Sequence, residues 1–183
     1  MAQRLRFSTA RELFEAFPSA LDDMAARPSD RASLEFLKDL AAGPTPEDAI
    51  TFSAYLLGLR EAVWWGHQCL HMIPDKLGAE DLEMMTLAEE WVRRPEERQR
   101  IAALQAGMAS QQKSPGVWIA LAAGWSGGSM TGPDEMPVAP PPNLTPKAVN
   151  AGVLSGLARV DRGARASTLK AFVDMSIRLA TRV

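Results

Sequence analysis

Two histidines four residues apart are the side chains of this sequence best suited to chemistry. His67 and His71 are the only histidines among the 183 residues, and their spacing places both imidazoles on one side of an α-helix, as two zinc ligands require. The HExxH pattern of metalloproteases is absent, because Gln68 occupies the place of its glutamate. A third ligand would have to be a carboxylate such as Glu61, Glu80 or Asp81. The pair alone does not complete a metal site, so we predict no bound metal and no cofactor, with His67 and His71 as the candidate ligands if one binds.

The single cysteine, Cys69, suggests a thiol nucleophile with a neighbouring histidine as its base. On a helix, however, Cys69 lies about 160° around the axis from both His67 and His71, so neither imidazole can reach it. We therefore expect Cys69 to act as a small apolar side chain in the core. One cysteine also excludes an intramolecular disulfide and fits a reducing compartment.

No other catalytic motif is complete. The Gly-x-Ser-x-Gly elbow of hydrolases is absent, and the glycine-rich segment 124–129 lacks the Lys-Ser/Thr ending of a phosphate loop. The formal net charge is −2. The sequence also has no dense stripe of Lys and Arg side chains that could bind a nucleic acid. These observations favour a non-catalytic protein over an enzyme.

The histidines belong to a helix predicted over residues 59–73. Its apolar half is expected to face the core and contains Ala62, Val63, Trp65, Gly66, Cys69, Leu70, Met72 and Ile73. Trp64 falls on the polar half, where it must pack against another helix or face solvent. An exposed tryptophan beside arginine and histidine is typical of a binding interface. The predicted partner-binding residues are Arg60, Trp64, His67 and His71.

Helix signals recur along the rest of the chain, while alternating β-branched runs are nearly absent. We predict an all-α multi-helix bundle of about eight helices, with amphipathic stretches at 79–93 and 164–181 among them. The nine-residue apolar run 117–125 is too short to span a membrane and is expected to be a buried helix. Gly152 and Gly156 should allow a close approach between helices. The tryptophans expected in the core are Trp65, Trp91 and Trp118.

A long segment rich in glycine and proline, residues 126–144, interrupts the helical pattern. We predict a single helical domain over 1–183, with lobes 1–125 and 145–183 joined by this loop as the alternative division. Pro137 and Pro140 fit the minimal PxxP spacing without a flanking basic residue, so a solvated connector is the preferred interpretation.

The Arg-Glu-Ala-Val-Trp-Trp segment at 60–65, followed by Cys69, resembles a recurrent motif of an uncharacterised bacterial helical protein family. That family is loosely associated with type VI secretion gene clusters, next to adaptor and spike-tip proteins. The resemblance implies an accessory cytosolic protein such as an effector adaptor or chaperone. It transfers no catalytic residues to this chain.

The sequence thus predicts a non-catalytic cytoplasmic protein that binds another protein, with neither nucleic-acid binding nor membrane insertion. No signal-peptide core follows the first residues. One alternative is a small-molecule or metal-binding enzyme that uses His67 and His71 with nearby carboxylates. A further alternative is an immunity-type inhibitor of a toxin.

Overall fold

The computed structural model describes residues 5–131 and 135–181, and its regular structure in those ranges is helical. The all-α prediction is confirmed. The described residues form ten α-helices, where about eight were expected. The α-helices are α1 (Ala10–Ala16), α2 (Ala20–Asp23), α3 (Ser33–Ala41), α4 (Glu47–Leu56), α5 (Leu59–His71), α6 (Ala79–Arg93), α7 (Glu97–Ala109), α8 (Pro115–Gly124), α9 (Leu144–Ala158) and α10 (Arg162–Ala180).

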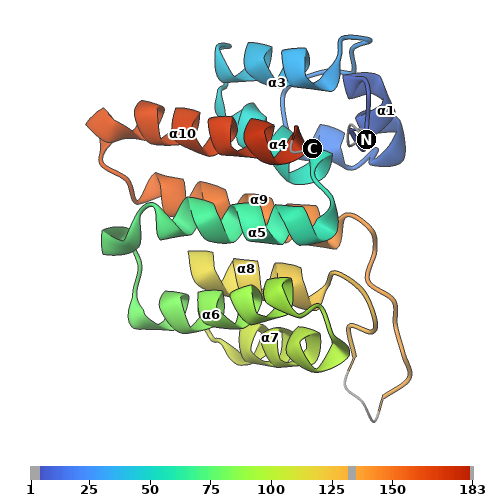
Figure 1. The fold of residues 1–183 in the computed structure, drawn as a ribbon, viewed down its shortest axis with the longest axis vertical. Helices are drawn as coiled ribbons and strands as arrows, with labels where there is room; N and C mark the ends of the chain where they lie inside the picture. Colours follow the sequence, from blue (N-terminus) through green and yellow to red (C-terminus); the bar gives the residue numbers. More distant parts are fainter. Residues whose placement is uncertain (1–4, 132–134, 182–183) are drawn as a thin grey trace.

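The helices lie across the long axis of the molecule in successive layers (Figure 1). From α3 to α7 the chain passes from one end of the stack to the other, and from α8 to α10 it returns. The inner layers therefore pair an early helix with a late one: α4 with α10, α5 with α9, and α6 with α8. Residues far apart in the sequence share each layer.

Helix α8 is the most deeply buried element. Every residue from Pro115 to Gly124 is buried except Trp118, which is half-buried. Helices α6, α7 and α9 surround α8, so its apolar side chains are removed from water except for part of Trp118. This confirms the buried helix expected from the apolar run. Within the described residues, no helix is both long and apolar enough to cross a membrane.

The two glycines expected to allow close packing do so. A Cβ atom on Gly152 would lie 2.8 Å from Cδ1 of Ile119, and one on Gly156 would lie 2.5 Å from Cδ2 of Leu70. Helix α9 can therefore lie directly against α8 and α5. The helices on the two sides of the 126–144 loop, α8 and α9, pack against each other.

A buried carboxylate joins the layers through hydrogen bonds. Asp81 of α6 accepts from the backbone N–H of Gly116 at 2.7 Å and from Arg159 at 3.0 Å, thereby linking α6 to α8 and to the end of α9. It also accepts from the N–H of Gly78 at the start of its own helix. Burial alone would raise the pKa of Asp81, but these donors outweigh it and lower the pKa.

A second buried polar group holds the start of the long loop. The Arg100 guanidinium donates to the carbonyl groups of Gly124 and Ser129 and pairs with Glu97. Gly128, with φ of +61°, lies against that guanidinium, where a Cβ atom would collide with it. The described residues at 135–139 are exposed, including Pro137 of the PxxP pattern.

Three apolar residues in or next to the helices are exposed: Met72, Leu82 and Met108. Met72 was placed in the apolar half of the 59–73 helix, but α5 ends at His71 and Met72 is its C-terminal cap. Leu82 and Met108 lie on helix faces that no neighbouring helix covers. Periodicity finds the apolar face of a helix, but only the packing decides how wide the covered part of that face is.

Gly116 provides a test of the close contact between α6 and α8. A Cβ atom there would collide with the carbonyl oxygen of Asp81, which is backbone and cannot rotate away. We expect Gly116→Ala to lower the free energy of unfolding by about 2 kcal/mol, measured by denaturant titration. The control is Gly163→Ala in α10, where nothing lies within 4 Å of the new Cβ. That variant should gain about 0.5 kcal/mol, and equal effects of the two substitutions would contradict the packing described.

Candidate interaction site on helix α5

The segment predicted to carry the chemistry is a single α-helix, Leu59–His71. The inner half is buried as expected, apart from the terminal Met72. Gly66 lies on that half, where a Cβ atom would meet Cδ1 of Ile119 at 2.7 Å and Cγ1 of Val149 at 3.1 Å. This close contact with α8 and α9 fixes the rotation of α5 about its axis. The opposite side of α5, with the predicted site residues, therefore turns away from those two helices.

Three of the four predicted residues form a stack of parallel rings. The Trp64 and His67 rings lie 5.3 Å apart between centroids with 8° between their planes, and those of His67 and His71 lie 6.1 Å apart at 12°. Trp64 is half-buried, His67 is buried and His71 is exposed. We call these three side chains the α5 ring stack. Its stacked geometry requires side chains three and four residues apart on one helix face.

The fourth predicted residue, Arg60, points to the neighbouring helix. Its Nε donates to the backbone carbonyl of Val92 at 2.7 Å, near the C-terminal end of α6. This bond satisfies a carbonyl that has no partner within its helix, and the positive charge suits the negative end of the α6 dipole. Arg60 is nevertheless exposed, so it lies at the edge of the site and does not join the stack.

Helix α6 contributes two residues that sequence reasoning missed. Oε2 of Glu89 lies 3.8 Å from Nε2 of His67, and Oε1 of Glu89 accepts from Arg93 at 2.6 Å. On the other side of the imidazole, the Gln68 amide lies 3.2 Å from Nδ1 of His67. Glu89 and Arg93 have the spacing of an exposed ion pair on any helix, so nothing in the sequence links them to α5.

Burial keeps the His67 imidazole neutral at physiological pH. Loss of water around the ring lowers the pKa of His67, and the nearby His71 and Arg93 lower it further, while Glu89 opposes them. A neutral imidazole can stack on the indole ring of Trp64 without a buried charge. The site is therefore a stack of aromatic rings with charged groups around it.

The expected third metal ligands lie elsewhere or have other partners. Asp81 is occupied by the N–H groups and Arg159 described above, Glu80 accepts from Ser110, and the Glu61 carboxylate lies against Gly58 at the start of α5. Across residues 5–131 and 135–181, no group of three or more His, Cys, Asp or Glu side chains is arranged to hold a metal ion. In these ranges no third side chain joins His67 and His71 in such an arrangement.

The lone thiol behaves as predicted. Cys69 is fully buried on the inner half of α5, and burial raises its pKa well above the ordinary value. A thiol held in this state is a poor nucleophile. Among the tryptophans expected in the core, Trp65 and Trp91 are buried, and Nε1 of Trp65 donates to the carbonyl of Phe172 at 2.9 Å. Trp118 is only half-buried.

The lowered pKa of His67 predicts a dependence of stability on pH. The unfolded chain takes up a proton near pH 6.5, whereas the folded chain takes it up only at lower pH, so acid favours unfolding. We expect the free energy of unfolding to fall between about pH 7.5 and pH 5.5, and to fall less in His67→Gln. His71→Gln is the control and should retain most of the dependence. If His67→Gln retains the full pH dependence of the free energy of unfolding, the assignment of His67 as a buried neutral imidazole is wrong.

The comparisons with known proteins identify a family. No curated protein and no solved structure matches the chain. A family model does match, over residues 36–180, which include the α5 ring stack, Arg60 and the α6 residues beside them. Its description is that of a family of unknown function, DUF6931, and because it covers most of the chain, this protein belongs to that family.

Proposed function

We propose that this protein is a non-catalytic binding protein that holds a partner protein on the α5 ring stack, with Arg60 and the Glu89–Arg93 pair at its edge. The observation that carries the proposal is the half-exposed indole of Trp64, held parallel to the buried ring of His67. Tryptophan is enriched among the residues that dominate binding energies at protein interfaces.

The rigidity of the stack favours binding. An interface side chain that becomes ordered only on binding costs about 0.5–1.5 kcal/mol of conformational freedom. The Trp64 ring is already ordered by His67, and His67 is held by its burial and by Gln68. Trp64 therefore offers apolar area to a partner at little entropic cost.

The surroundings of the stack suit a protein better than a small molecule. Arg60 and Arg93 are exposed, and Glu89 is accessible in part. An aromatic centre with charged groups around it matches the apolar core and polar rim of protein interfaces. Charges at a rim mainly select among partners and speed association.

The identity of the partner is proposed from the resemblance of residues 60–65. If that resemblance holds, the partner is a component of a type VI secretion system, and this chain acts in the cytoplasm as an accessory protein, an adaptor or a chaperone. A toxin found as the partner would instead favour an immunity-type inhibitor.

Site-specific cross-linking tests the binding surface. A photoreactive phenylalanine analogue at position 64, expressed in the producing cells, should form a covalent adduct with one defined protein, identified by mass spectrometry. The matched control is the same analogue at position 118, because Trp118 is also half-buried but lies on α8. No adduct at position 64, or the same adducts at both positions, would refute the proposed surface.

Truncation of the indole gives the corresponding energetic test. With the cross-linked partner purified, Trp64→Ala should weaken binding by at least about tenfold, as measured by calorimetry, because an interface tryptophan is typically worth 1.4 kcal/mol or more. Trp118→Ala should leave the affinity unchanged. Thermal unfolding of both variants controls for lost stability, and equal losses of affinity would contradict a specific role for Trp64.

A further inference from the structure

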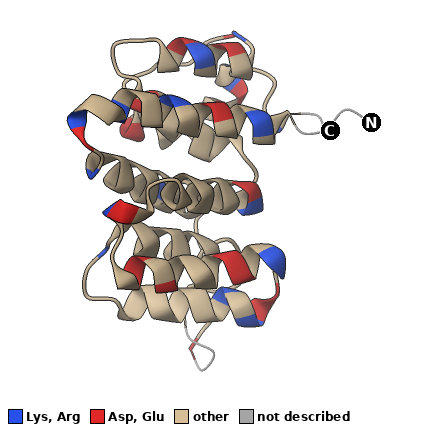
Figure 2. Ribbon diagram, turned by 60° about the vertical axis from the view of Figure 1, so that its left-hand side comes forward, with Lys and Arg blue, Asp and Glu red and all other residues tan. Residues whose placement is uncertain are grey.

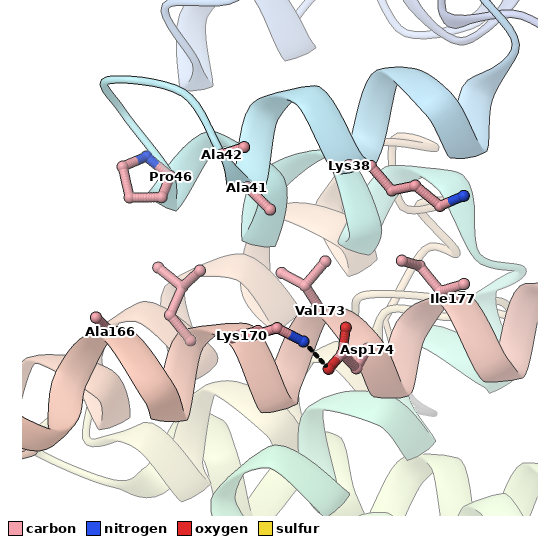
Figure 3. Close-up of a pocket in the computed structure, with 10 residues that line it drawn as sticks. Lys38, Ala41, Ala42, Pro46, Ala166, Lys170, Val173, Asp174 and Ile177 are labelled. Carbon is pink, nitrogen blue, oxygen red and sulfur yellow. Dashed lines mark hydrogen bonds and ion pairs between the residues drawn. The ribbon is translucent and has the colours of Figure 1, made fainter.

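Two ion pairs with the same i,i+4 spacing differ in their surroundings. Lys170 and Asp174 are joined at 2.6 Å on α10, beside a mostly apolar groove of about 530 Å³ between α3 and α10, the α3–α10 groove (Figure 3). Glu89 and Arg93 are joined at 2.6 Å on α6, but beside the buried ring of His67. Acidic and basic positions are interspersed along the helices (Figure 2), so the neighbouring imidazole, and not the pair itself, distinguishes Glu89.

The His67 ring has two aromatic neighbours and a carboxylate beside it. Trp64 and His71 stack against it at centroid distances of 5.3 Å and 6.1 Å. Its Nε2 lies 3.8 Å from Oε2 of Glu89, whereas a hydrogen bond between ionised groups is about 2.7–2.9 Å long. The other oxygen of Glu89 accepts from Arg93. In the neutral state the ring thus keeps its aromatic neighbours, and Glu89 has Arg93 as its ionic partner.

A proton on the ring changes the partner that Glu89 favours. A buried imidazolium needs an ionic partner because water does not reach it, and Glu89 is the neighbour that favours the charged form. Arg93 is 73% exposed, so water can solvate its guanidinium when the carboxylate leaves. Glu89 then exchanges Arg93 for His67, and the two groups must approach by about 1 Å to form the hydrogen bond. This movement displaces the ring toward α6 and away from its parallel contact with Trp64.

The groups around the ring set the pH at which this exchange occurs. Burial is the largest influence and lowers the pKa of His67, and the charges of His71 on α5 and Arg93 on α6 lower it further, while Glu89 raises it. The inner half of α5 packs against α8, which has no charged side chain. The ring is therefore neutral at pH 7 and takes up its proton below about pH 6.5, the ordinary value for histidine.

We propose that protonation of His67 opens the α5 ring stack, so that the indole of Trp64 is held in place at neutral pH and freed in acid. The consequence for a partner rests on the function proposed above: a protein bound through the ordered indole is retained at neutral pH and released in acid. The opening of the stack does not depend on that function, because it follows from contacts within the chain.

Nuclear magnetic resonance of the full chain between about pH 8 and pH 5 tests this opening. Nuclear Overhauser contacts between the rings of Trp64 and His67 should be present at the upper pH and disappear with the midpoint of the His67 titration. The indole of Trp118, half-buried on α8, is the internal control and should not change at that midpoint. Ring contacts that persist after His67 is protonated would overturn the proposal.

Two substitutions on α6 should move the midpoint in opposite directions. Glu89→Gln removes the carboxylate that favours the charged ring and should lower the midpoint by about 0.5 pH units, whereas Arg93→Gln removes an opposing cation and should raise it by about as much. Asp174→Asn breaks the matched pair on α10 and should leave the midpoint unchanged. Circular dichroism melting checks that the variants remain folded. The same midpoint in all three variants would contradict the exchange of Glu89.

The outcome is separate from that of the cross-linking at position 64. Loss of the ring contacts in acid supports the switch even if no adduct forms, because the contacts are measured without a partner. Ring contacts that are retained in acid refute the switch and leave the proposed binding surface standing.

Discussion

The burial of α8 is the constraint on which the rest of the structure depends. Its ten residues contain no charged side chain, so every side of the helix gains free energy by leaving water, and about 25 cal/mol per Å² of apolar surface drives its enclosure. A helix that must be covered all round needs at least three neighbours. Helices α6, α7 and α9 supply this cover, which is why the chain passes down the stack, turns at α7 and returns.

Close packing around α8 also fixes the neighbouring layers. Gly116, Gly152 and Gly66 remove the Cβ atoms that would hold α6, α9 and α5 away from it. The short distances allow the Asp81 carboxylate to reach the backbone of α8 and the Arg159 guanidinium, so a buried charge finds its partners. Apolar burial therefore supplies most of the energy, while the hydrogen bonds at Asp81 set how α6, α8 and α9 align.

The orientation of α5 connects this packing to the proposed binding surface. Because Gly66 must face α8 and α9, the side chains of Trp64, His67 and His71 turn toward α6 and solvent. His67 is then covered in part by α6 and loses its charge at neutral pH, and the neutral ring supports the indole of Trp64. The orientation of this surface is thus set by contacts in the interior.

The sequence by itself determined the helical class, a single helix from residue 59 whose end it placed two residues too late, the burial of Cys69 and α8, and the close approach at Gly152 and Gly156. These features are local, because helix periodicity, proline positions and side-chain size act within one segment. Only the tertiary structure decided which parts of each apolar face are covered, as the exposure of Met72, Leu82 and Met108 illustrates. It also brought Glu89 and Arg93 to His67, directed Arg60 to Val92 and opened the α3–α10 groove. Each of these depends on the side chains of another helix, and no spacing within a single segment specifies which helix that is.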